Sequence, residues 1–173
     1  MMISGLGSAA SDMSITVRPA SEADAHAACN VLRRSIRELC VADHGNDEQV
    51  LARWLANKTP ENVREWIGAP SSYSVVAVDG SIVAGFGLIG RDGEIQMCYL
   101  IPEVQHRGAG KLMLRALEEQ AARWGLTRVF LTSSVTARQF YERNGFLQSG
   151  EPKSVYGLRG VCPMAKKIAP APR

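Results

Sequence analysis

The chain has 173 residues, of which 46% are hydrophobic and 21% are charged, and its formal net charge is +3 at pH 7. This length suits one domain with a sizeable core and is short for two. The charge is too small for the clustered basic footprint of a nucleic-acid-binding protein. No apolar run approaches the ~18 residues that a membrane-spanning helix needs. These properties predict a cytoplasmic protein with no nucleic-acid and no membrane partner.

Cysteines and histidines are scattered along the chain, with no C-x-x-C pair and no histidine at metal-ligand spacing. This pattern predicts free thiols and no metal site. The residues concerned are Cys29, Cys40, Cys98, Cys162, His26, His44 and His106.

The first residues, 1–13, lack the basic start and the long apolar run of a signal peptide, and they predict a flexible leader. Residues 14–20 alternate like a strand that Pro19 ends. Ser21 is a candidate N-cap with Asp24 in the capping-box position. Apolar residues at helical spacing then predict three helices, over 21–40, 47–55 and 59–67, with the "DHGND" stretch breaking the first.

The second half alternates strands and helices. Asp79-Gly80 between two apolar runs predicts a hairpin. The expected strands cover 73–78, 82–89, 94–101, 128–132, 146–148 and 161–168, and the expected helices cover 110–124 and 136–144. We therefore expect one α/β domain over 14–168, followed by a tail at 169–173.

Two glycine-rich stretches compete for a phosphate-binding role. Residues 85–90, "GFGLIG", match G-x-G-x-x-G, but a dinucleotide site needs a helix to open within the motif, and here a turn and another strand follow. These glycines instead indicate a strand against which another element packs closely.

Residues 102–114, "PEVQHRGAGKLML", have the strand, turn and helix that the first stretch lacks. Backbone N–H groups at a helix start, together with the helix dipole, suit a phosphate or pyrophosphate. Gly108 and Gly110 leave this backbone open, and Arg107 and Lys111 add charge at the rim. From the residues alone, a glycine-rich turn with solvated cations remains an alternative.

Two motifs resemble the GNAT superfamily of acyl-CoA-dependent N-acetyltransferases. Gln105-x-x-Gly108-x-Gly110 is similar to its Q/R-x-x-G-x-G/A motif. Residues 137–146, "ARQFYERNGF", resemble its A-x-x-F-Y-x-x-x-G-F helix and strand. The order of the elements also fits over 14–168. The resemblance implies a GNAT-like α/β fold, in which helices flank a central, mixed and bent sheet.

The resemblance also implies acetyl-CoA as the acyl-donor co-substrate, with no metal. In this family the turn before the long helix binds the coenzyme A pyrophosphate through backbone amides, which assigns His106, Arg107, Gly108, Ala109, Gly110 and Lys111. The end of the preceding strand holds the pantetheine arm by backbone bonds, which assigns Cys98, Tyr99 and Leu100. One N–H group there would polarise the thioester carbonyl.

Tyr141 falls on the usual general acid of the family and on a cofactor contact. A phenol with a pKa near ~10 stays protonated at neutral pH and can donate to the leaving sulfur. The alternative is that Tyr141 only packs in the core beside Phe140. Ser134 stands where many members carry an Asn that contacts the coenzyme, and its hydroxyl, or that of Ser133 or Thr136, could replace this contact.

The general base is less clear from the sequence. Glu94 is the candidate, since alternation places its side chain on the same face as those of Gln96 and Cys98. A solvated turn carboxylate and a water chain are the alternatives. Substrate selection is expected from the N-terminal helices and the loop between them. There an acidic segment could receive a cationic amine or simply cap a helix and face water, namely Asp43, His44, Asp47 and Glu48.

These observations predict an N-acetyltransferase that transfers the acetyl group of acetyl-CoA to a primary amine of a small molecule or peptide, by direct attack in a ternary complex. One alternative is a non-catalytic acyl-CoA-binding regulatory module. Another is an interaction protein that dimerises through its C-terminal strand, and a homodimer is possible in either case.

Overall fold

The computed structural model describes residues 14–155 and 157–172, so the predicted leader at 1–13 lies outside the described residues. The helices are α1 (Ala25–Leu39), α2 (Val41–His44), α3 (Glu48–Leu55), α4 (Pro60–Gly68), α5 (Ala109–Arg123) and α6 (Arg138–Arg143). The strands are β1 (Ile15–Pro19), β2 (Ser72–Asp79), β3 (Ile82–Gly90), β4 (Ile95–Leu100), β5 (Arg128–Ser133), β6 (Leu147–Gln148), β7 (Lys153–Val155) and β8 (Leu158–Lys167). Residues 169–172 of the predicted tail have no regular structure.

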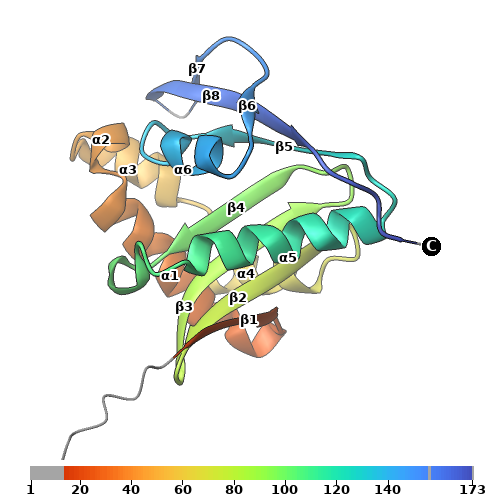
Figure 1. Ribbon diagram of the computed structural model, residues 1–173. Helices are drawn as coiled ribbons and strands as arrows, with labels where there is room; N and C mark the ends of the chain where they lie inside the picture. The colour runs from red at the N-terminus through yellow and green to blue at the C-terminus, as the bar shows by residue number, and fades with distance from the viewer. Residues whose placement is uncertain (1–13, 156, 173) are drawn as a thin grey trace, which may run out of the picture.

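The strands form two antiparallel sheets that meet at one point. The first has the order β1-β2-β3-β4, and the second has the order β5-β8-β6, with β7 also pairing with β8. A single parallel bridge between Glu94 and Phe130 joins the two sheets. Beyond this bridge β4 and β5 diverge, as Figure 1 shows. The two sheets taken together are therefore mixed, because this bridge is parallel and the other pairings are antiparallel. Along the rest of β4, a gap separates β4 from β5.

Helices cover both faces of the first sheet, with α5 on one face and α1 and α4 on the other (Figure 1). The glycines of β3 explain how close α5 comes. A Cβ at Gly85 would lie 2.8 Å from Met113 Sδ, and one at Gly87 would lie 3.1 Å from Leu117 Cδ1. Met113 and Leu117 are fully buried on α5. The "GFGLIG" stretch is thus a packing surface, as the sequence indicated.

The first predicted helix is divided in the structure. The capping box of Ser21 and Asp24 is present, but it begins a 3-10 turn, Glu22–Asp24, and α1 starts at Ala25. The "DHGND" stretch is only partly a break, because α2 extends into it as far as His44 and is followed by the cap Gly45, whose φ of 57° suits glycine. Strand β7 was not expected, since three residues give too short a pattern to recognise.

No helix within residues 14–155 and 157–172 combines the length and the apolar character needed to cross a membrane. The four cysteines are all unpaired.

Asp24 is expected to stabilise the fold through its charge. Arg18 donates to both of its carboxylate oxygens at 2.8 Å, and these hydrogen bonds, with the Ser21 amide, lower the pKa of Asp24 to about 2. A carboxyl whose pKa is lower in the folded state contributes stability above its unfolded pKa, near 4, and loses it as the pH falls toward 2.

We therefore expect Asp24→Asn to reduce the free energy of unfolding by about 2 kcal/mol at pH 7. The difference from the wild type should shrink as the pH falls from about 4 to about 2. Urea denaturation at a series of pH values measures it, with Glu48→Gln, an exposed acid, as the control. A difference that does not depend on pH would show that Asp24 acts by packing alone.

Candidate active site

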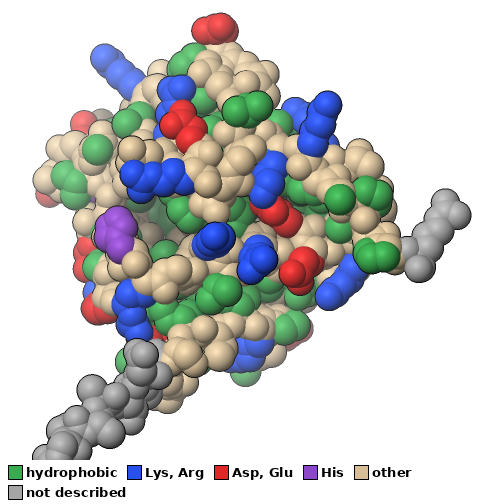
Figure 2. Space-filling view, viewed as in Figure 1, with side chains coloured by type: hydrophobic (Ala, Val, Ile, Leu, Met, Phe, Trp, Pro, Cys, Tyr) green, Lys and Arg blue, Asp and Glu red, His purple; other side chains and the backbone are tan. Residues whose placement is uncertain are grey.

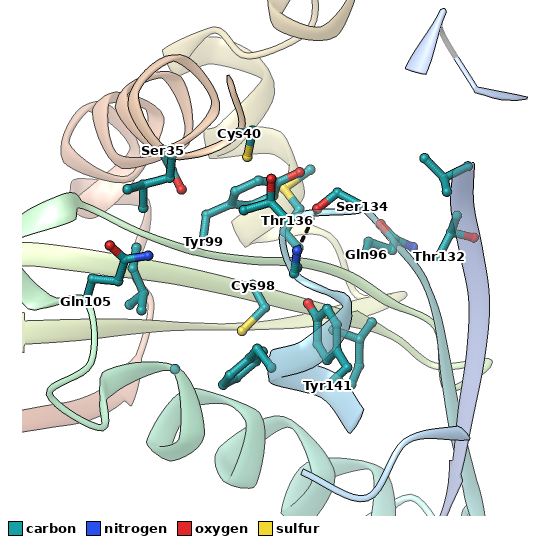
Figure 3. Close-up of a pocket in the computed structure, with 18 of the residues that line it drawn as sticks. Ser35, Cys40, Gln96, Cys98, Tyr99, Gln105, Thr132, Ser134, Thr136 and Tyr141 are labelled. Carbon is teal, nitrogen blue, oxygen red and sulfur yellow. Dashed lines mark hydrogen bonds between the residues drawn. The ribbon is translucent and has the colours of Figure 1, made fainter. Parts of the chain in front are cut away.

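A cavity of about 810 Å³ fills the gap between β4 and β5. Its walls come from α1, α3, β4, the start of α5, α6 and the β7–β8 hairpin, and Figure 3 shows the side chains that converge on it. The lining residues used below are Arg53, Lys58, Cys98, Tyr99, Leu100, His106, Gly108, Ala109, Gly110, Lys111, Ser134, Phe140, Tyr141 and Arg143.

The first turn of α5 presents unpaired backbone donors to this cavity. Gly108 is the N-cap with φ 85°, and no side chain caps the helix. The first amide bonded within the helix is that of Leu112, which donates to the Gly108 carbonyl at 3.1 Å. The N–H groups of residues 108–111 therefore have no acceptor among the described residues. Such an end attracts an anion.

Gly108 and Gly110 are needed in this turn for different structural reasons. A Cβ at Gly108 would meet nothing within 4 Å, so its positive φ is what requires glycine. A Cβ at Gly110 would lie 3.1 Å from the Phe140 ring, so Gly110 lets α6 approach α5 closely. His106 also has a positive φ, 62°, which is uncommon for a residue with a side chain.

Arg107 differs from its neighbours, because the structure does not bring it to the cavity. Its amide donates to the Val104 carbonyl at 3.3 Å, and its guanidinium pairs with Asp79 at 2.6 Å. The side chain therefore holds the turn against the β2–β3 hairpin. Of the two cations expected at the rim, Lys111 lines the cavity and Arg107 does not, and Arg143 lines it as well. Figure 2 shows Lys and Arg side chains beside a hollow on this face of the molecule.

The free edge of β4 offers backbone groups to a ligand. The Ile101 amide donates to the Ala84 carbonyl at 2.9 Å, toward β3. Because successive residues of a strand alternate their hydrogen-bonding edge, the backbone of Tyr99 also turns to β3, whereas that of Cys98 and Leu100 turns to the open edge. Of the three residues assigned to the pantetheine arm, Cys98 and Leu100 therefore present backbone N–H and C=O groups to the gap.

Tyr141 is positioned by aromatic packing from α6. Its ring meets Phe140 and Phe146 edge to face, at centroid distances of 5.1 and 5.5 Å, and the side chain is 7% exposed. The residue also lines the cavity, and Figure 3 shows it beside Cys98. Core packing and a cavity-facing phenol are thus combined in one side chain.

Burial keeps this phenol protonated. It raises the pKa of Tyr141 well above 10, and the nearby Cys98 and Tyr99 raise it further. Burial likewise raises the pKa of the Cys98 thiol to about 12. At neutral pH the cavity therefore holds a neutral phenol that can donate a proton, and a neutral thiol that is a poor nucleophile.

Of the three candidate hydroxyl residues, Ser134 and Thr136 line the cavity and Ser133 does not. The Ser134 Oγ accepts the Ala137 amide at 3.2 Å (Figure 3). Ser133 is buried and donates to the Ser134 carbonyl, and the Thr136 hydroxyl bonds to Asp43. Asp43 also accepts the Val135 amide at 2.7 Å, so it ties α2 to the loop before α6.

No carboxylate is among the cavity-lining residues in the described part of the chain. Asp43 holds the loop after β5, and Asp47 caps α3 by accepting the Gln49 and Val50 amides. His44 is buried between the Ile36 carbonyl and the Asn46 amide. Asp43, His44 and Asp47 therefore form hydrogen bonds within the fold, and none of them lines the cavity.

Glu94 also lies outside the cavity lining, at the bridge where the two sheets meet. Four residues of strand place it about 13 Å from Cys98 along β4. General-base catalysis needs hydrogen-bond reach, or one intervening water. Glu94 is absent from the lining of the cavity that Tyr141 lines, and its role as the base stays a prediction.

We expect Glu94→Gln to keep the rise of rate with pH at the acidic end of the profile, because Glu94 lies outside the cavity lining, at the bridge between the two sheets. The pH dependence of kcat/KM for the variant and the wild type measures it, with Glu48→Gln as the control. Loss of the low-pH limb in Glu94→Gln alone would assign the base to Glu94.

The family model described as "Acetyltransferase (GNAT) domain" matches residues 41–168. The chain belongs to the GNAT acetyltransferase family. This GNAT protein also resembles solved structures. One is a GCN5-related N-acetyltransferase from Rhodopseudomonas palustris, with a TM-score of 0.79 and 22% identity, and the match covers 90% of this chain and 98% of that one. Another is the PaiA N-acetyltransferase from Thermoplasma acidophilum in complex with coenzyme A, with a TM-score of 0.78 and 23% identity, and the match covers 90% of this chain and 100% of that one. These similarities confirm the predicted fold.

Among curated proteins, the GNAT chain is 35% identical to an amino-acid acetyltransferase of Pseudomonas putida over 82 residues. The match covers 45% of this chain and 19% of that protein. The similarity therefore concerns about half of the present chain and about a fifth of its relative.

Two cavity residues of this GNAT domain, Arg53 and Lys58, were not predicted from the sequence. Arg53 belongs to a helix recognised only by its apolar face, and Lys58 precedes the N-cap Thr59. A single Arg on a helix or a single Lys in a loop forms no sequence motif that would mark it as part of a site. Their place at the cavity depends on how α3 packs against α1.

Proposed function

We propose that this protein transfers the acetyl group of acetyl-CoA to a primary amine, by direct attack of the amine in a ternary complex. One observation carries the proposal. The unpaired N–H groups of residues 108–111 stand at one end of a cavity whose wall includes the phenol of Tyr141. An anion-binding end and a neutral acid in one cavity suit a phosphate-bearing thioester donor.

The residues present fit acetyl-CoA along the whole gap. The start of α5 offers amides and Lys111 to the pyrophosphate. The open edge of β4 offers the backbone of Cys98 and Leu100 to the pantetheine arm, and Ser134 lines the cavity on the side of β5. The coenzyme A complex of PaiA from Thermoplasma acidophilum supports this fit, since that protein shares the fold.

In the proposed reaction, acetyl-CoA supplies the acetyl thioester and the acceptor supplies a neutral amine nitrogen. A carbon–nitrogen bond forms and the carbon–sulfur bond breaks. Tyr141 donates a proton to the sulfur and regains one from water, while the amine gives one proton to water. The N–H group of Cys98 or Leu100 polarises the carbonyl.

Direct attack, without an acetylated enzyme, is supported by the cavity chemistry. Cys40 and Cys98 line the cavity, and burial raises the pKa of each thiol to about 12, which keeps both protonated. A thiol must become a thiolate to act as a nucleophile. The same cavity continues to α1, α3 and the β7–β8 hairpin, where an amine has room beside the donor.

Calorimetric titration with acetyl-CoA, with ADP as the control, tests the donor. We expect micromolar binding of acetyl-CoA and weaker binding of ADP, which lacks the pantetheine arm. The release of free thiol with amines then tests the transfer. Absence of acetyl-CoA binding to the folded protein would reject the proposal, and binding without transfer to any amine would favour a regulatory acyl-CoA-binding module.

A further inference from the structure

The cavity lining is cationic at more than the proposed phosphate site. The lining residues that carry positive charge or can gain it are Arg53, Lys58, His106, Lys111 and Arg143. His106 and Lys111 belong to the turn and first residues of α5, and Arg143 lies on α6, so these three surround the proposed phosphate site. Arg53 and Lys58 come from α3 and the loop that follows it. This pair therefore needs another explanation than the donor phosphates.

Lys58 is a buried cation without an anionic partner. It is 8% exposed, and its Nζ donates to the neutral Asn57 Oδ1 at 2.6 Å, with the Trp66 ring at 5.8 Å. No carboxylate pairs with it among the described residues. Burial without such a partner lowers the pKa of Lys58. Burying an ammonium in this way costs free energy unless an anion arrives to pair with it.

The backbone of Lys58 is fixed in place. Its carbonyl accepts a hydrogen bond from Arg33 Nη1 at 3.0 Å and one from Cys29 Sγ at 3.2 Å, both from α1. Arg33 also donates to the Leu55 carbonyl at 3.3 Å. The end of α3 and the loop after it are therefore held against α1, and this contact fixes the backbone of Lys58 at the cavity wall.

Arg53, on α3, also lines the cavity. Its side chain is exposed, and it forms no ion pair among the described residues. Its Nη1 lies 3.4 Å from the point that a Cβ at Gly157 would occupy, so the guanidinium sits between α3 and the β7–β8 turn. A guanidinium in such a place can bind a carboxylate through two parallel hydrogen bonds.

We infer that the acceptor is a small amine that also carries a carboxylate, and that Arg53 and Lys58 bind this carboxylate. The inference rests on the proposed function and names its substrate class. A polyamine or an aminoglycoside would bring further positive charge to a wall that has two unpaired cations and no carboxylate among the described residues. These cations would repel such an acceptor, whereas they attract an anionic group on the acceptor. α-Amino acids are the simplest members of this class.

Steady-state thiol release at saturating acetyl-CoA tests the inference with matched acceptors. The set contains the common α-amino acids, their α-carboxamides, β-alanine, spermidine and kanamycin. We expect kcat/KM to be at least tenfold higher for the best acid than for its carboxamide and for the two cationic amines. The carboxamide keeps the amine and the side chain and loses only the negative charge.

Variants locate the carboxylate. Arg53→Gln should raise KM for the acid by tenfold or more, with kcat changed less than threefold, and should leave KM for the carboxamide unchanged. Lys58→Met keeps a long apolar side chain and should act in the same way. Arg64→Gln removes an equal charge from the exposed surface of α4, outside the cavity, and should change neither constant.

The outcomes separate this inference from the proposed function. If acetyl-CoA does not bind by calorimetry, the proposed function itself fails. If acetyl-CoA binds but a cationic amine or a carboxamide is preferred, the inference alone is wrong. The inference is also wrong if the protein saturated with coenzyme A neither acetylates nor binds any acid of the set, or if Arg53→Gln and Lys58→Met both match Arg64→Gln.

Discussion

Tyr141→Phe is expected to lower kcat by about 10²-fold or more, the contribution typical of a positioned general acid. The affinity for acetyl-CoA should change less than threefold. The substitution removes one oxygen and keeps the ring that packs against Phe140 and Phe146. Because the pKa of Tyr141 is raised by burial, the wild-type rate should show no loss of this acid below about pH 10.

The measurement pairs steady-state kinetics with calorimetric titration of acetyl-CoA. Tyr73→Phe is the matched control, since Tyr73 is a half-buried tyrosine of β2 that does not line the cavity. Turnover of Tyr141→Phe equal to that of Tyr73→Phe would exclude Tyr141 as the acid. A parallel loss of turnover and of acetyl-CoA affinity would instead assign to the phenol a role in binding the donor.

Lys111→Glu is expected to weaken acetyl-CoA binding by tenfold or more. Lys111 is the third residue of α5 and lines the cavity beside the unpaired amides. A glutamate there repels the pyrophosphate and competes for the same N–H groups. The same glutamate is favourable to a helix start, since negative charge near the N-terminus complements the helix dipole. The melting temperature of the apoprotein should therefore not fall.

This pairing of opposite effects makes Lys111→Glu a sharper test than Gly110→Glu, which would also displace Phe140. Arg64→Glu makes the same change of charge on the exposed surface of α4 and should bind acetyl-CoA like the wild type. Unchanged affinity of Lys111→Glu by calorimetry would mean that the pyrophosphate does not lie at the start of α5.

The sequence by itself determined the family, the order of the main elements and the glycine-rich turn at the start of α5. These features depend on local rules: periodicity for α5, Asp79-Gly80 for the hairpin, and Gly108 with φ 85° for the N-cap. The "GFGLIG" stretch was also correctly separated from a phosphate site. The element that follows a glycine pattern decides its interpretation, because a dinucleotide site needs a helix there. In this chain the element after β3 is the strand β4.

Only the tertiary structure decided which side chains share the cavity. Arg107 was expected at the phosphate rim, yet it pairs with Asp79 of another hairpin, and Glu94 stands at the bridge where the sheets meet. Lys58 and Arg53 reach the cavity through the packing of α3. Such placements depend on contacts between residues far apart in the chain, and no local pattern encodes them. The sequence thus carried the proposed donor site, whereas the charge of the proposed acceptor site became visible only in the assembled fold.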